Sequence, residues 1–158
     1  MSEERQQLYN KWLLIANKDL VRADAAYMRK DSEFVYFHCQ QAVEKLAKGI
    51  YILLVSPKIP RVHSINDIIK LFESHLEKPV DSEMIKLFAE LSNFYISGRY
   101  PDEFGDLICY SDDEEEYLNL LTQTKEAFQC LLKAIPKQDS EAEDQEILSE
   151  PSKQSPKP

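Results

Sequence analysis

The chain has 158 residues, of which 43% are hydrophobic, and a formal net charge of -9. Its length suits one domain, and its apolar content is sufficient for a core, which excludes a wholly disordered chain. The 3 glycines are too few for a strand-rich fold with tight hairpins or for a glycine-rich nucleotide loop. The negative charge disfavours generic DNA binding, because lysine and arginine must neutralise the phosphate backbone.

The cysteines and the start of the sequence indicate the compartment. Cys39, Cys109 and Cys130 are odd in number and show no C-x-x-C spacing, which is typical of reduced cytoplasmic thiols. No basic segment followed by an apolar run opens the sequence, so we expect no secretory signal. The longest apolar run, Ile50–Val55, is too short to span a bilayer. We therefore expect a cytoplasmic protein without a membrane segment.

Apolar residues recur at helical spacing through the first part of the chain. A first helix is predicted from about Glu3 to Met28, with an inward side formed by Leu8, Trp12, Ile15, Asp19, Ala23 and Ala26. Asp19 is unusual there, because it is a carboxylate on an otherwise apolar side. Asp31-Ser32-Glu33 gives a stop and a new N-cap signal. A second helix then runs to about Leu54, with an inward side formed by Val35, Cys39, Ala42, Val43, Leu46, Ile50 and Leu53.

Prolines and capping residues separate the next two helices. The prolines of Ser56–Pro60 end the second helix, because each lacks an amide donor and restricts the residue before it. His63 and Ser64 open a third helix that ends at Pro79 and carries Ile65, Ile68, Ile69, Phe72 and Leu76. Asp81 caps a fourth helix. A connector from Gly98 to Tyr110 follows it.

The last helix and the tail complete the predicted architecture. Ser111 and Glu114 fit a capping box at the start of a fifth helix, which Pro136 closes. Residues 137–158 are rich in charge, serine, glutamine and proline, which predicts a disordered tail. The expected fold is all-α, an up-and-down helical bundle of about five helices over residues 1–136.

One row of polar residues on the second helix is a candidate binding surface. His38, Gln41, Lys45 and Lys48 are spaced three, four and three residues apart, so they share one side of the helix. That side would suit a phosphate, a nucleotide or a protein partner. The alternative is a solvated helix face in which Glu44 and Lys48 form an ordinary i,i+4 pair. The spacing leaves both interpretations open.

A second candidate lies at the exit of the fourth helix, in the segment Tyr95–Asp102. Arg99 is flanked by two tyrosines, Tyr100 among them, and offers a planar donor fork beside stacking surfaces. This arrangement suits a phosphate or a base. Alternatively, Gly98 caps the helix and Arg99 pairs with Asp102 or Asp19 to hold the loop.

Several enzyme classes lack their required residues in this sequence. There are no paired Glu-x-x-His motifs for a di-iron bundle, and three scattered histidines give little basis for zinc. No G-x-S-x-G, Walker A or Rossmann pattern occurs. His38 and Cys39 do not form a nucleophile pair, because adjacent helical residues point about 100° apart. We expect no cofactor and no metal.

The order of these motifs resembles the HEPN domain family (higher eukaryotes and prokaryotes nucleotide-binding). The likeness covers roughly residues 8–135 and rests on four segments, which are Trp12 with Ala16–Ala23, Phe37–Lys48, His63–Ile65, and Tyr95–Asp102. It implies a helical bundle that dimerises. It also implies a minimal nucleotidyltransferase as a partner, in a pair frequently of toxin–antitoxin type, and nucleotide binding.

Other HEPN proteins are metal-independent ribonucleases with an Arg-x(4–6)-His motif. Arg99 matches the arginine, but the histidine positions hold Phe104, Gly105 and Asp106, and no histidine follows His75. Without this histidine the usual chemistry loses its proton carrier.

The sequence therefore predicts a non-catalytic HEPN homodimer that binds a nucleotide, a nucleotidyltransferase partner, or both. The candidate binding residues are His38, Gln41, Lys45, Lys48, Arg99, Tyr100 and Asp102, with Asp19 as a structural anchor for Arg99. Two alternatives stay open. One is a ribonuclease that uses His38 or His63 beside Arg99, and the other is a bundle that binds only another protein.

Overall fold

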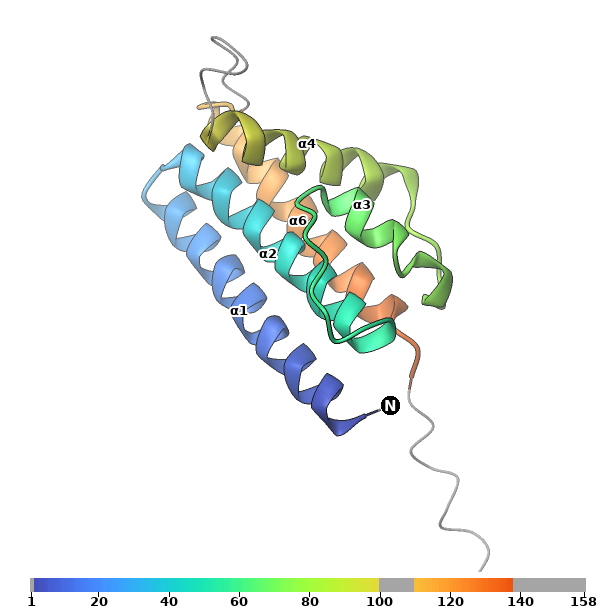
Figure 1. Cartoon of the computed structure of the whole chain (residues 1–158). Coiled ribbons are helices and arrows are strands. Elements are labelled where there is room, and N and C mark those ends of the chain that lie inside the picture. Colours follow the sequence, from blue (N-terminus) through green and yellow to red (C-terminus); the bar gives the residue numbers. More distant parts are fainter. Residues whose placement is uncertain (1, 100–109, 138–158) are drawn as a thin grey trace, which may run out of the picture.

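The structure, a computed structural model, describes residues 2–99 and 110–137, with only the backbone for residues 95–99 (Figure 1). Within these residues it consists of helices and no strands, which confirms the predicted all-α bundle. The elements are α1 (Glu3–Met28), α2 (Ser32–Leu54), α3 (Ile65–Lys70), the short 3-10 helix η1 (Glu73–His75), α4 (Ser82–Arg99) and α6 (Glu114–Ala134). The predicted tail lies almost wholly outside the described residues, at 138–158.

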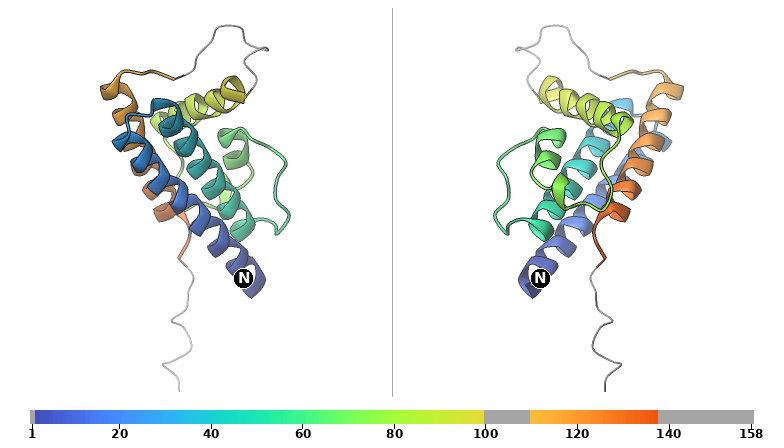
Figure 2. Two further views of the ribbon diagram at one scale, coloured as in Figure 1. Left: turned by 90° about the vertical axis from the view of Figure 1, so that its left-hand side faces the viewer. Right: turned by 90° about the vertical axis from the view of Figure 1, so that its right-hand side faces the viewer.

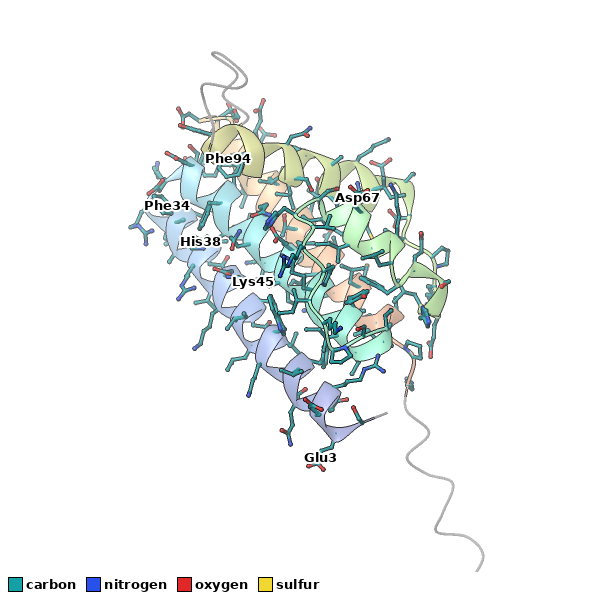
Figure 3. The ribbon with its side chains drawn as sticks, viewed as in Figure 1. Glu3, Phe34, His38, Lys45, Asp67 and Phe94 are labelled. Atoms are coloured by element: carbon teal, nitrogen blue, oxygen red, sulfur yellow. The ribbon has the colours of Figure 1, made fainter. Side chains whose placement is uncertain are left out.

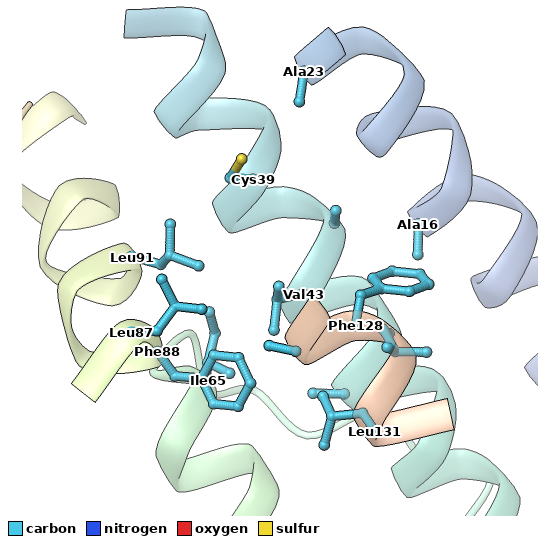
Figure 4. Close-up of a cluster of buried hydrophobic side chains, with 14 of the residues drawn as sticks. Ala16, Ala23, Cys39, Val43, Ile65, Leu87, Phe88, Leu91, Phe128 and Leu131 are labelled. Atoms are coloured by element: carbon cyan, nitrogen blue, oxygen red, sulfur yellow. The ribbon is translucent and has the colours of Figure 1, made fainter. Parts of the chain in front are cut away.

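Helix α2 is the centre of the bundle. It packs against α1, α3, α4 and α6, and all of its predicted inward residues are buried. Figure 4 shows side chains from these helices meeting in one cluster around α2. The largest fully buried side chains are Phe72, Phe88 and Phe128. Burying a side chain of this size stabilises the folded state by about 1.5–3 kcal/mol.

Helices α1 and α2 are joined by close packing of small residues. Ala16, Ala23 and Ala26 are fully buried in α1, and a Cβ added at Gly49 would lie 3.0 Å from Trp12 Cβ. The prediction that Ile15 faces inward is wrong, because its side chain is 38% exposed. The inward side of α1 is rotated toward its alanines, since small side chains let the two helices approach closely.

The third helix is shorter than predicted. It begins at Ile65 after the N-cap Ser64, as expected, but ends at Lys70 and is followed by η1. Phe72 leaves the helical conformation with φ −131° and buries its ring completely. The helix therefore breaks where the backbone turns to place this ring in the core.

The start of α6 also differs from the prediction. The cap is Asp113, whose carboxylate accepts hydrogen bonds from the amides of Glu115 and Glu116. The predicted capping box of Ser111 and Glu114 is wrong, because the Ser111 hydroxyl instead accepts from the Asp113 amide. A carboxylate two residues later satisfies two helix amides at once, and it lies at the positive end of the helix dipole.

No helix in the described part of the chain is long and apolar enough to cross a membrane.

Candidate functional site

The polar side of α2 meets a buried carboxylate from α1. Asp19, 1% exposed, accepts hydrogen bonds from Lys45 and from His38, whose Nδ1 lies 3.0 Å from Asp19 Oδ1. Arg22 adds a third contact, with its Nη1 at 3.3 Å from the same oxygen. Figure 3 shows His38 and Lys45 on the side of α2 next to α1. The carboxylate that interrupted the apolar pattern of α1 is thus the anchor of this cluster.

These contacts set the charge of Asp19 and the proton position on His38. Burial alone would raise the pKa of the Asp19 carboxyl, but the hydrogen bonds from Lys45 and His38 outweigh it and lower the pKa below its ordinary value. An ionised carboxylate can only accept hydrogen bonds. His38 therefore carries a proton on Nδ1, and in its neutral form its Nε2 is an acceptor.

A second buried carboxylate, Glu44, lies further along α2. Its side chain is 7% exposed and accepts from Lys48 Nζ at 2.6 Å and from Gln40 Nε2 at 2.5 Å. His63 Nδ1, from the segment before α3, lies 3.1 Å from Glu44 Oε1. The Glu44–Lys48 pair predicted for a solvated helix face is present, but both side chains are buried. The contact of Glu44 with His63 holds the segment before α3 against α2.

The two clusters follow each other along α2, and we call them together the α2 polar face. It comprises Asp19 and Arg22 from α1, His38, Gln40, Gln41, Glu44, Lys45 and Lys48 from α2, and His63. Gln41 extends the Glu44 cluster, because its amide donates to Gln40 Oε1 at 2.7 Å. All of the α2 residues predicted from the spacing lie within this surface.

Aromatic rings border the α2 polar face at the start of α2. The rings of Phe37 and Phe34 lie 5.1 and 6.0 Å from the imidazole of His38, measured between centroids. The Phe34 side chain is 47% exposed. It therefore presents an open ring surface next to the Asp19 cluster, of the kind on which a planar base can stack.

The predicted residues at the exit of α4 are only partly described. Helix α4 ends at Arg99, and its Phe94 ring lies 5.6 Å from the Tyr36 ring on α2. The backbone of Arg99 is therefore at the same end of the bundle as the first turns of α2. Its side chain, and Tyr100 and Asp102, lie outside the described residues. The pairing of Arg99 with Asp19 stays a prediction.

Four residues of the α2 polar face were absent from the predicted binding residues, namely Arg22, Gln40, Glu44 and His63, although His63 was named for the alternative ribonuclease. Gln40, Glu44 and Lys48 follow one another at intervals of four along a helix that is otherwise largely buried. Such a polar row inside an apolar helix signals an internal hydrogen-bond network. Arg22 follows Asp19 by three residues in α1, and this spacing puts its side chain within reach of the Asp19 carboxylate.

Within residues 2–99 and 110–137, no group of three or more histidine, cysteine or carboxylate side chains is placed to hold a metal ion. The α2 polar face offers the charged and hydrogen-bonding side chains of Arg22, His38 and Lys45.

The described part of the chain is thus a helical bundle with charged, hydrogen-bonded side chains between its first two helices. The HEPN domain model matches residues 9–135, and the chain belongs to the HEPN domain family. The chain is similar to the crystal structure of TT1696 from Thermus thermophilus, with 26% identity and a TM-score of 0.56. That likeness covers 77% of this chain and 95% of TT1696. No curated protein matches the chain.

Proposed function

We propose that this HEPN protein is a homodimer that binds the phosphate groups of a nucleotide on the α2 polar face. The observation that carries the proposal is a local excess of positive charge. Three cations, Arg22, Lys45 and Lys48, face two carboxylates, Asp19 and Glu44. This surface keeps one positive charge in excess within a chain of net charge -9. A small anion is favoured there, while extended nucleic acid is repelled by the rest of the molecule.

The accessible part of the α2 polar face suits a phosphate. The side chains of Arg22 and Lys45 are 58% and 24% exposed, so a ligand can reach them from solvent. Asp19 holds both cations near each other before any ligand arrives, which reduces the entropy lost on binding. Charge-assisted hydrogen bonds from lysine and arginine to phosphate are stronger than neutral ones.

The exposed Phe34 ring supports a nucleotide over inorganic phosphate. A base stacked on Phe34 would place its sugar near His38 and its phosphates toward Lys45. Stacking on an aromatic ring is worth about 1–3 kcal/mol per base. Arg99, which the α4 backbone brings to this end of the bundle, is a further proposed phosphate ligand, and Tyr100 and Asp102 are proposed to adjoin it.

The test is a melting scan with ATP, GTP, AMP, GMP and inorganic tripolyphosphate. A saturable rise in Tm is expected with a nucleotide, since a ligand that binds only the folded state stabilises it by about 2.7 kcal/mol at 100 times its Kd. Lys45→Ala and Arg99→Ala should each remove the rise relative to their own ligand-free Tm. Lys86→Ala is the matched control, because Lys86 is exposed on α4 and pairs only with Glu83 among the described residues.

Two further outcomes of this scan separate the possible functions. Phe34→Ala should weaken the rise with ATP and leave the rise with tripolyphosphate unchanged, because only the base needs the ring. If no nucleotide shifts the Tm, the protein is a partner-binding module instead. The proposed partner is then a minimal nucleotidyltransferase of the kind that the family resemblance implies, and co-purification with the product of a neighbouring gene tests it.

The contact between Asp19 and His38 supports a second candidate function, that of a metal-independent ribonuclease. A carboxylate that fixes the Nδ1 proton leaves Nε2 available as a general base, as in other carboxylate–histidine pairs. Such an enzyme would cleave RNA in the presence of EDTA and lose this activity in both His38→Ala and Arg99→Ala. RNA that stays intact over hours with the wild-type protein contradicts it.

A further inference from the structure

The non-helical stretch that joins α2 to α3 carries an unbalanced positive charge. Residues 55–64 include Lys58 and Arg61 and no aspartate or glutamate. Both side chains are exposed, and neither forms an ion pair among the described residues. Ile59 between them is 48% exposed. Two unpaired cations therefore flank an exposed apolar side chain, and we call residues 58–61 the basic segment.

The backbone of the basic segment is open as well. Figure 2 shows this part of the chain arching away from the helices between the end of α2 and the start of α3. Pro60 has no amide hydrogen, and the amides of Ile59 and Arg61 donate no hydrogen bond to any described residue. Open backbone of this kind can be paired by another extended chain, whose side chains then meet those of the first.

Residues 138–150 of the same chain have the opposite character, and we call them the acidic segment. They contain no lysine or arginine and six carboxylates, namely Asp139, Glu141, Glu143, Asp144, Glu146 and Glu150. They also contain the apolar pair Ile147 and Leu148. A segment of this composition cannot bury enough apolar surface to fold alone, so any order it gains comes from binding to another surface.

The acidic segment begins at the end of the bundle where the basic segment leaves α2. Helices α2 and α6 start together, because the Ser32 hydroxyl donates to Asp112, just before α6. Figure 1 shows both helices running to the opposite end of the bundle. Ile147 follows Lys137 by ten residues, and ten residues span at most about 36 Å, roughly the length of α6. The apolar pair is therefore within reach of the basic segment.

We infer that the acidic segment docks on the basic segment of its own chain. Its carboxylates pair with Lys58 and Arg61, and Ile147 or Leu148 covers Ile59. Opposite charges and apolar side chains are thus matched on both segments. Because the two segments belong to one chain, the effective concentration of the acidic segment is about millimolar. Contacts that are individually weak therefore suffice to fill the surface.

The first turn of α1 restricts where the acidic segment can lie. Glu3 and Glu4 are exposed there, and Arg5 of the same turn donates to the Ile52 carbonyl near the end of α2. These carboxylates repel an acidic chain from the start of α1, including the approach to Lys11. The docked segment is therefore expected on the side of the basic segment that faces away from α1.

Other cations near the basic segment and the end of α6 have carboxylates beside them. Lys70 on α3 is paired with Asp67 at 3.0 Å. Lys137 lies next to Glu77, whose Oε1 accepts from the Lys137 amide, and Lys78 follows Glu77 directly. Lys58 and Arg61 have no such neighbour within residues 55–64. Charge therefore favours the basic segment over these lysines.

Zero-length cross-linking of the full chain with a water-soluble carbodiimide tests the inference, because it joins a lysine amine to a carboxylate in direct contact. Peptide mass spectrometry should find Lys58 joined to carboxylates of the acidic segment. The link should be lost in 1 M NaCl, where the Debye length is about 3 Å. In an equal mixture of 14N- and 15N-labelled protein, both linked peptides should carry the same label. Mixed-label links would place the acidic segment on a second copy and contradict the inference.

Two sets of variants complete the test with Lys58 kept as the reporter. Arg61→Glu combined with Ile59→Ser should abolish the Lys58 link, as should Ile147→Ser combined with Leu148→Ser. Lys11→Glu combined with Lys18→Glu is the matched control and should retain it, since both lysines are exposed on α1. Arg61, Ile59, Lys11 and Lys18 are exposed, so the Tm should stay within a few degrees of the wild-type value.

Three results overturn the inference. They are no link from Lys58 in the wild type at low salt, a Lys58 link that survives Arg61→Glu with Ile59→Ser, and links from Lys11 in place of Lys58. No nucleotide is present in this experiment, so its outcome does not depend on the proposed ligand of the α2 polar face.

Discussion

Asp19 is a buried carboxylate with three charged or titratable partners, because its side chain is only 2% exposed and contacts Arg22, His38 and Lys45. Replacing it by asparagine keeps the shape but removes the charge that the lysine and histidine require. Breaking a buried pair in this way leaves uncompensated charge, and we expect Asp19→Asn to cost about 2–4 kcal/mol of unfolding free energy. Urea denaturation at pH 7 measures this cost.

Asp24→Asn is the matched control for this substitution. Asp24 pairs with Lys125, but both side chains are near half exposed, so its loss should cost at most about 1 kcal/mol. Equal costs for the two variants would show that Asp19 has no special role in stability.

The lowered pKa of Asp19 gives its stabilising effect a definite pH dependence. Its folded pKa lies below the unfolded value, which is about 3.9 for aspartate. The stabilisation is therefore fully present above about pH 5, beyond the unfolded pKa, and is lost as pH falls through the folded pKa. We expect the difference in unfolding free energy between wild type and Asp19→Asn to shrink between pH 5 and pH 2 (approximate limits from the same reasoning). A constant difference would contradict the assigned shift.

At the scale of single elements, the start of α6 tests which residue is the cap. Asp113→Ala removes an acceptor for two helix amides, and we expect a loss of about 1 kcal/mol. Ser111→Ala should cost clearly less, since its hydroxyl contacts only the Asp113 amide among the described contacts. Guanidinium denaturation of both variants measures the loss of unfolding free energy in each. A larger loss for Ser111→Ala would restore the capping box predicted from the sequence.

The contact between α1 and α2 depends on Gly49. In an exposed helix, alanine in place of glycine stabilises by about 1 kcal/mol. Here the added Cβ would lie 3.0 Å from Trp12 Cβ, which belongs to a helix and cannot rotate away. We expect Gly49→Ala to destabilise the protein by about 1–3 kcal/mol. A rise in Tm on thermal melting would show that the two helices separate easily.

The limits of prediction from sequence are clear in these elements. The bounds of α1 and α2 agree with the predicted ranges, because period and capping residues are local signals. The end of α3 does not, because the burial of Phe72 against other helices ends the helix earlier than Pro79 would. The capping box failed because two acceptors, Ser111 and Asp113, compete at the start of α6. Local spacing cannot rank two such acceptors.

The candidate site was also predictable only in part, because some of its contacts lie within one helix and others depend on how the helices pack. Spacing along α2 placed His38, Gln41, Lys45 and Lys48 on one side, and the structure brings all four into the α2 polar face. Spacing within one helix could not reveal that Asp19 of α1 binds His38 and Lys45, because that contact depends on how two helices pack. The contribution of His63 likewise depends on the path of the segment before α3.

At the scale of the whole molecule, α1 presents two sides of different character. One side holds Asp19 in the α2 polar face, where an anion is proposed to bind. Another side of α1 carries the exposed residues Leu14, Val21 and Met28.

The central claim is that a nucleotide binds the α2 polar face, and an amide NMR titration with ATP tests it most directly. We predict saturable shifts in the amides of α2 from His38 to Lys48 and in the amides of α1 around Asp19 and Arg22, with no such change in the outer turns of α6. Saturable shifts confined to other helices, or no shifts at millimolar ATP, would contradict the claim.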